Sequence, residues 1–214
     1  MLFRSSGSTL GYATDALRAR LGERLTPEVR DTMALVDERS ATLRRDVAKV
    51  IRFMGWHAFP GIDGPMKADS DLGRVVRRIL EETGAGDRRR IRVTGWKHAG
   101  RAVPGQAAHD AIQPVVENAL VHGDGKVLLE IHPLREDEAW MTVSDSGEGM
   151  SVEQAGRFLD PGQNAPVIHA GGAPCLGLAT AQGAARAMAC EWRLAGRSSK
   201  GLALSLVPLN ATRT

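Results

Sequence analysis

Aromatic residues and cysteines are scarce in this sequence, and each scarcity excludes a class of function. Only 4% of the 214 residues are aromatic, so the core must be aliphatic and no aromatic residues interleave with basic ones to stack nucleic-acid bases. The two cysteines, Cys175 and Cys190, have no metal-ligand spacing and imply no disulfide framework. We therefore expect reduced thiols, a cytoplasmic location and no nucleic-acid partner.

Long apolar runs and a strong charge imbalance are missing as well. No stretch approaches the ~20 apolar residues that cross a bilayer, and no signal peptide is visible, so we expect no membrane segment in this chain. The net charge of +3 is mild. Its clearest cluster, Arg88-Arg89-Arg90, lies just before a probable strand, where a solvated strand entrance is the favoured interpretation.

The N-terminal part of the sequence predicts two helices. Leucines recur on one side of residues 9–25, and Thr26-Pro27-Glu28 has the composition of a helix start. The second helix runs to about Met54, with apolar residues three and four positions apart. We expect an antiparallel hairpin over 9–54 that forms a homodimer by pairing with a second copy into a four-helix bundle. The alternative is that the hairpin packs on the rest of its own chain.

A segment rich in Pro, Gly and Asp follows, so we predict a helical hairpin at 1–56, a linker at 57–66 and a second domain at 67–214. The predicted fold class is α+β. It consists of the N-terminal antiparallel helical hairpin and an α/β sandwich, in which helices cover one face of a mixed, mostly antiparallel sheet. The helices expected in the second domain are 71–82, 106–122 and 177–189, and the strands are 90–96, 127–133, 139–143, 190–195 and 201–208.

Two short stretches contain the candidate chemistry. In the first, Asp145 follows a strand and precedes Gly147 and Gly149. Glycine there lets the backbone lie close against a ligand, and the carboxylate can accept a hydrogen bond from an exocyclic amine. In the second, Asn118 and His122 are four apart on a predicted helix and project from one face. An Asn amide oxygen suits Mg²⁺, and a His can meet phosphate oxygens. Taken separately, the first stretch is typical of a turn and the second of a helix C-terminus.

The order of the two stretches resembles the ATP-binding domain of sensor histidine kinases, within the wider family shared with gyrase, Hsp90 and MutL. The similarity covers about residues 67–208. It rests on Glu117-Asn118-Ala119 with His122-Gly123 on a helix, a hairpin, the Asp145 motif, and a helix that opens at Leu176-Gly177-Leu178. The hairpin at 9–54 is similar to the dimerisation hairpin of the same kinases.

The resemblance implies a set of site residues and cofactors. Asn118 would hold Mg²⁺, Asp145 would accept from the adenine amino group of ATP, and Glu117 would assist as a catalytic base. Residues 159–176 would form a mobile lid over the phosphates, and the helix start after it would offer backbone N–H groups to them. The full ATP-binding set that it implies is Asn118, His122, Asp145, Gly147, Gly149, Gly171, Gly172, Leu176, Gly177 and Leu178.

The sequence departs from the family pattern at three places. Pro114 replaces the Asn or Glu that the family carries four residues before Asn118, so fast hydrolysis by a Glu there is excluded. The usual lid motif G-x-G-L-G-L reads Ala173-Pro174-Cys175-Leu176-Gly177-Leu178. The phosphoacceptor His would precede residue 1, and no histidine occurs before His57. These changes affect the part of the implied ATP site that would hold the phosphates more than the part that would hold the adenine.

The leading hypothesis is the ATP-binding core of a histidine kinase in a two-component signal transduction system. It would bind Mg-ATP and transfer a phosphoryl group to a histidine supplied in trans or lost upstream, with a response regulator receiver domain as partner. The alternative is a non-catalytic pseudokinase or phosphotransfer-type dimeric docking module for a response regulator. A serine kinase of the anti-sigma type is disfavoured, because it lacks the helical hairpin.

Overall fold

The structure is a computed structural model in which the chain divides into two compact units, 1–51 and 52–214. It describes residues 26–58, 66–133, 135, 138–149, 176–197 and 201–209, together with five isolated positions, which are Ala16, Ala19, Arg20, Glu153 and Leu159. In the described part of the chain, no helix combines the length and the apolar character that a membrane span requires.

The long helix α2 (Pro27–Ala58) has the start that the sequence predicts. The backbone N–H groups of Val29 and Arg30 donate to the carbonyl of Thr26, and Glu28 lies in the first turn, next to the positive end of the helix dipole. The helix continues four residues beyond Met54. Most of its large apolar side chains are exposed in the isolated chain, with Leu43 at 65% and Met54 at 58% exposure, whereas Met33 is buried. The first helix of the expected hairpin lies almost wholly outside the described residues.

The second unit contains one mixed sheet with the strand order β2-β4-β5-β7-β6. β2 pairs with β4 in parallel, and the other three pairings are antiparallel, which confirms the mostly antiparallel sheet. A separate pair of two-residue strands, β1 and β3, lies beside it. The strands are β1 (Ser70–Asp71), β2 (Ile91–Thr94), β3 (Ala102–Val103), β4 (Val127–Ile131), β5 (Met141–Ser144), β6 (Cys190–Arg197) and β7 (Leu202–Pro208).

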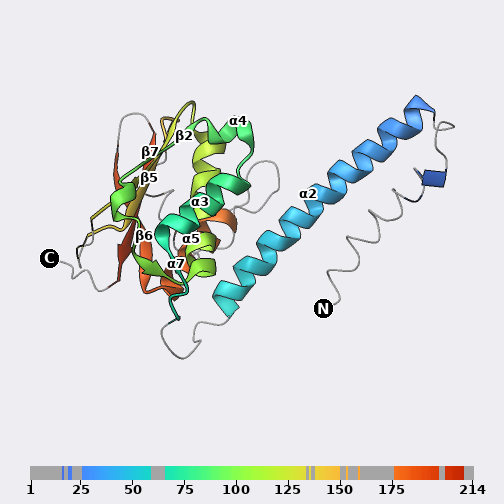
Figure 1. The fold of residues 1–214 in the computed structure, drawn as a ribbon. Helices are drawn as coiled ribbons and strands as arrows, with labels where there is room; N and C mark the ends of the chain where they lie inside the picture. Colours follow the sequence, from blue (N-terminus) through green and yellow to red (C-terminus); the bar gives the residue numbers. More distant parts are fainter. Residues whose placement is uncertain are drawn as a thin grey trace. The chain divides into compact units, whose positions relative to one another are not determined.

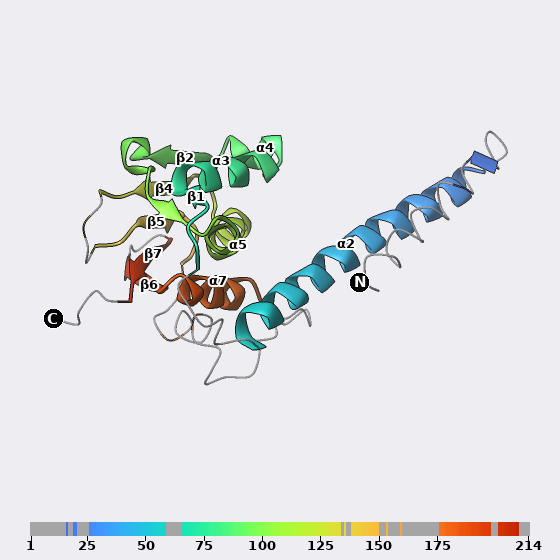
Figure 2. The same cartoon turned by 60° about the horizontal axis from the view of Figure 1, so that its bottom comes forward.

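Three helices cover one face of this sheet, as Figures 1 and 2 show from two directions. They are α3 (Leu72–Glu82), α5 (Gly105–His122) and α7 (Leu176–Ala187). Asp71 caps α3 by accepting a hydrogen bond from the backbone N–H of Arg74 at 2.8 Å. Alanines fill the space between α5 and α7, which lets the two helices approach closely; they are Ala107, Ala108, Ala111, Ala181, Ala184 and Ala185.

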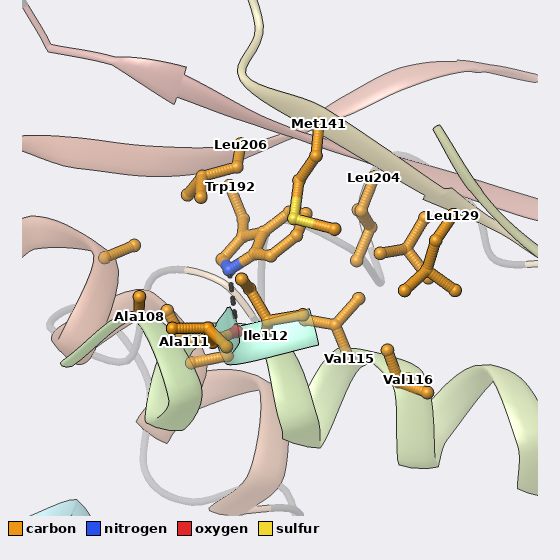
Figure 3. Packing of buried hydrophobic residues seen from close by; sticks show 14 of the residues in the cluster. Ala108, Ala111, Ile112, Val115, Val116, Leu129, Met141, Trp192, Leu204 and Leu206 are labelled. Carbon is orange, nitrogen blue, oxygen red and sulfur yellow. Dashed lines mark hydrogen bonds between the residues drawn. The ribbon is translucent and has the colours of Figure 1, made fainter. Parts of the chain in front are cut away.

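The core lies between α5 and the sheet, as Figure 3 shows. Met141, Leu204 and Leu206 point from the strands toward the apolar face of α5, and each is buried. The Trp192 indole fills the space beside the α5 alanines, and its Nε1–H donates to the carbonyl oxygen of Ala111 at 3.0 Å. The largest buried side chain therefore has its one polar atom satisfied, as burial requires.

Four local predictions differ from the structure. Neither the short helix α4 (Ala85–Arg88), which follows α3, nor the two-residue strand β3 was predicted from the sequence. The linker expected at 57–66 overlaps α2, which extends to Ala58, and residues 59–65 lie outside the described residues. The strand expected over 90–96 stops at Thr94, followed by the short 3-10 helix η2 (Trp96–His98). Elements this short carry too few residues for a periodic pattern to appear.

Candidate functional site

One face of α5 runs between the two parts of the candidate site. Pro114, Asn118 and His122 follow one another at intervals of four residues, so they share this face. At 1.5 Å per residue, Pro114 and His122 are about 12 Å apart along the helix axis. The C-terminal end of the face contacts the Asp145 motif, and the N-terminal end contacts the start of α7.

At the C-terminal end, glycines bring the backbone of two segments together. A Cβ added to Gly147 would lie 2.1 Å from the carbonyl oxygen of His122, and one added to Gly123 would lie 2.9 Å from the Cβ of Asp145. Both distances are shorter than any real Cβ contact, so only glycine fits at these two positions. The structure therefore places the Asp145 motif against the end of the helix that contains Asn118.

The carboxylate of Asp145 is oriented by the backbone around it. Its Oδ1 accepts hydrogen bonds from the N–H of Gly147 at 2.9 Å and of Leu202 at 3.3 Å. These bonds hold the side chain and leave Oδ2 as an acceptor for a ligand. Gly201 and Gly149 have positive φ angles of 103° and 75°; Gly201 packs against Asp145 and Ser146, and Gly149 packs against Gly201. A Cβ on Gly201 would lie 1.9 Å from the carbonyl oxygen of Asp145.

At the other end of the face, Pro114 lies beside the first turn of α7. A Cβ added to Gly177 would be 3.7 Å from the Cβ of Pro114. α7 begins at Leu176, as predicted, and its first N–H groups have no partner within the helix. The side chain of Leu178 is 5% exposed and belongs to the core, so only its backbone is available to a phosphate. Pro114 has no polar side-chain atom to add to this end.

Asn118 and Glu117 differ in their surroundings. Asn118 is half-buried, and its amide makes no hydrogen bond within the described part of the chain. Glu117 is exposed, and its Oε1 accepts from the Nε2 of Gln113 at 3.0 Å. His122 is exposed at the end of the helix. Among the described residues, no three His, Cys, Asp or Glu side chains gather as a metal site, so a cation here would depend on the Asn118 oxygen, water and phosphate.

Several predicted site residues cannot be placed. Gly171, Gly172 and most of the expected lid at 159–176 lie outside the described residues. The set of site residues expected from the sequence did not include Gly123, Gly201 or Arg90, which contact the site segments through their backbone or by hydrogen bonds. Arg90 belongs to the run that we expected to be solvated, but its side chain is only 34% exposed and its guanidinium donates hydrogen bonds to the turn after α5. No local pattern in the sequence indicates these long-range contacts.

Comparisons with known proteins agree with this geometry. Residues 105–208 match the family described as Histidine kinase-, DNA gyrase B-, and HSP90-like ATPase. The fold is similar to that of full-length ShkA in complex with AMPPNP, with a TM-score of 0.68 and 17% identity over 94% of this chain and 46% of that chain. It is also similar to the Acinetobacter baumannii histidine kinase AdeS, with a TM-score of 0.55 and 14% identity over 96% of each chain. No curated protein sequence matches the chain.

Residues 105–208 therefore match the domain family that histidine kinases, DNA gyrase B and Hsp90 share. More particularly, a helix followed by this mixed sheet is the fold of a histidine kinase catalytic core, and the predicted resemblance is confirmed. The chain spans 46% of the length of ShkA.

Proposed function

We propose that this chain binds Mg-ATP along the Pro114–His122 face of α5 and supports phosphoryl transfer to a histidine. The observation that carries the proposal is the placement of this face. It joins the Asp145 motif, which suits adenine, to the first turn of α7, which suits phosphate. The span of about 12 Å between them is comparable to the length of a nucleoside triphosphate. The complex of ShkA with AMPPNP supports an adenine nucleotide as the ligand.

Each group would have a separate role. Asp145 Oδ2 would accept from the adenine amino group while Gly147 and Gly149 let the ring approach. Asn118 would supply an amide oxygen to Mg²⁺, which neutralises phosphate charge when bound. Glu117 would accept the proton of the attacking imidazole. The γ-phosphoryl group would pass to an imidazole nitrogen and ADP would leave, with the histidine supplied in trans or from a segment outside this sequence.

A second candidate function is a dimeric docking module that binds nucleotide without turning it over. The position of Pro114 favours it, because the residue nearest the start of α7 on this face has no polar side-chain atom. In this role the exposed apolar residues of α2 would pair with a second copy, and a response regulator receiver domain would be the partner.

Calorimetric titration with ATP, with and without Mg²⁺, tests nucleotide binding by the intact chain. We expect micromolar to millimolar affinity. The variant Asp145→Asn keeps an acceptor for the N–H groups of Gly147 and Leu202 but can turn a donor toward the adenine amine. It should bind more than tenfold more weakly at an unchanged melting temperature. Absence of any binding by the unsubstituted chain would overturn the proposal.

Radiolabelled ATP and a supplied helical hairpin with a phosphoacceptor histidine separate the two candidate functions. Transfer of the radiolabel to the hairpin by the unsubstituted chain, but not by Asp145→Asn, supports the kinase function. Nucleotide binding without label transfer, together with capture of a receiver domain that is indifferent to ATP, supports the docking module.

A further inference from the structure

Arg90 differs from the other two arginines in its run. Arg88 and Arg89 are exposed, whereas Arg90 is half-buried and its guanidinium makes three contacts. Its Nη2 donates to the carbonyl oxygen of Gly123 at 2.6 Å, and its Nε donates to that of Gly125 at 2.9 Å. Its Nη1 lies 3.3 Å from the carboxylate of Asp87.

The topology explains how an arginine before β2 reaches this turn. β2 and β4 are parallel neighbours, and α5 is the crossover between them. The start of β2 must therefore lie beside the loop that enters β4. The backbone confirms this placement, because the N–H of Val127 donates to the carbonyl of Arg90 at 2.9 Å. A cation at this point also faces the negative end of the α5 dipole.

The turn that Arg90 bridges has the Asp145 motif on its other side. Gly123 lies against Asp145, and a Cβ added to Gly125 would be 3.1 Å from the Oγ of Ser146. A movement of the 123–125 turn would therefore displace the segment that orients the Asp145 carboxylate. Two parallel hydrogen bonds from one planar guanidinium oppose such a movement better than a single ammonium would.

We propose that Arg90 is a positioning residue for nucleotide binding, which holds the 123–125 turn against Asp145 and Ser146 and so fixes the adenine end of the site. The inference rests on the proposed function and assigns Arg90 no contact with the ligand. Because it acts at the adenine end, its loss lowers affinity by the same factor for every adenine nucleotide. A residue that met the phosphates would instead affect ATP more than ADP, and ADP more than AMP.

The test is calorimetric titration of the full chain and of Arg90→Ala with ATP, ADP and AMP. We expect about a tenfold loss for each nucleotide, from two missing hydrogen bonds of a charged group. Added guanidinium chloride at low millimolar concentration should restore most of the affinity of Arg90→Ala by occupying the vacated position. Arg90→Lys keeps the charge but cannot bridge both carbonyls, so it should remain weakened. Arg89→Ala, the matched control from the same run, should bind as the unsubstituted chain does.

Three results would overturn the inference. They are unchanged affinity in Arg90→Ala, a loss that grows with the number of phosphates, and full affinity in Arg90→Lys. If Arg90→Ala is too unstable to titrate, Arg90→Lys and the guanidinium titration of a partly folded sample still decide the question. A failure of the unsubstituted chain to bind any nucleotide would refute the proposed function instead, so the two failures are distinguishable.

Discussion

Gly147 offers the sharpest test of how the proposed adenine end of the site is built. Replacing it with alanine would place a Cβ 2.1 Å from the carbonyl oxygen of His122, 3.0 Å from its carbonyl carbon and 3.1 Å from the Cα of Gly123. All three neighbours are backbone atoms at the end of α5, so no side-chain rotation can relieve the overlap. The end of the helix and the Asp145 segment must instead separate.

The size of the separation follows from these distances. Restoring an ordinary contact requires the His122 oxygen to retreat by about 1 Å. Overpacking of this kind costs about 1–3 kcal/mol of folding stability, or roughly 2–12 °C in melting temperature for a chain of this length. The same displacement separates Asn118 and His122 from Asp145. A misplacement of this size should lower ATP affinity at least about tenfold.

The assay combines thermal unfolding, followed by circular dichroism, with calorimetric titration of ATP well below the melting temperature. Gly86→Ala is the matched control, because Gly86 lies in α4 and a Cβ there meets nothing within 4 Å. Alanine at that helical position should leave binding unchanged and raise stability slightly.

An unchanged ATP affinity of Gly147→Ala, together with the melting temperature of the unsubstituted chain, would contradict this prediction. Such a result would mean that α5 and the Asp145 segment are not held in contact in solution. A loss of stability without a loss of affinity would also contradict the link between this contact and the site.

Three further predictions concern the body of the second unit. Trp192→Phe removes the hydrogen bond to the Ala111 carbonyl and part of the ring, so urea unfolding should show a loss of about 1–3 kcal/mol; an unchanged midpoint would contradict this. Burial raises the pKa of the Cys190 thiol to about 12, so in a Cys175→Ala background it should resist iodoacetamide at pH 8 until the chain unfolds. The contribution of this thiol to folding stability is complete below about pH 9 and is lost as the pH rises toward 12. Cys190→Ala should therefore lose less folding stability than the unsubstituted chain over this pH range. Partial burial tends to raise the pKa of Glu82, but hydrogen bonds from Arg78 and His109 outweigh it and lower the pKa below 4.5. Glu82→Gln should therefore destabilise the chain at pH 7, and the destabilisation should disappear as the pH falls through the lowered pKa of Glu82.

Local sequence chemistry was sufficient for the larger elements. The helix expected over 71–82 agrees with α3 to within a residue. The α5 helix and the hairpins around β5 and β7 were predicted almost as well, because each contains enough residues for a period of 3.6 or 2 to appear. The order of the Asn118 and Asp145 motifs indicated the family, and the match over 105–208 confirms it.

What sequence reasoning could not supply are contacts between residues far apart in the chain. The closeness of Gly201 to Asp145, the position of Pro114 beside Gly177 and the bridge from Arg90 to the 123–125 turn all join different elements. The sequence by itself determined the three long helices of the second unit, most of the strands and the resemblance to this ATPase family, because these depend on neighbours along the chain. Only the tertiary structure decided which backbones touch at the site, because those contacts depend on how the sheet and its helices pack together.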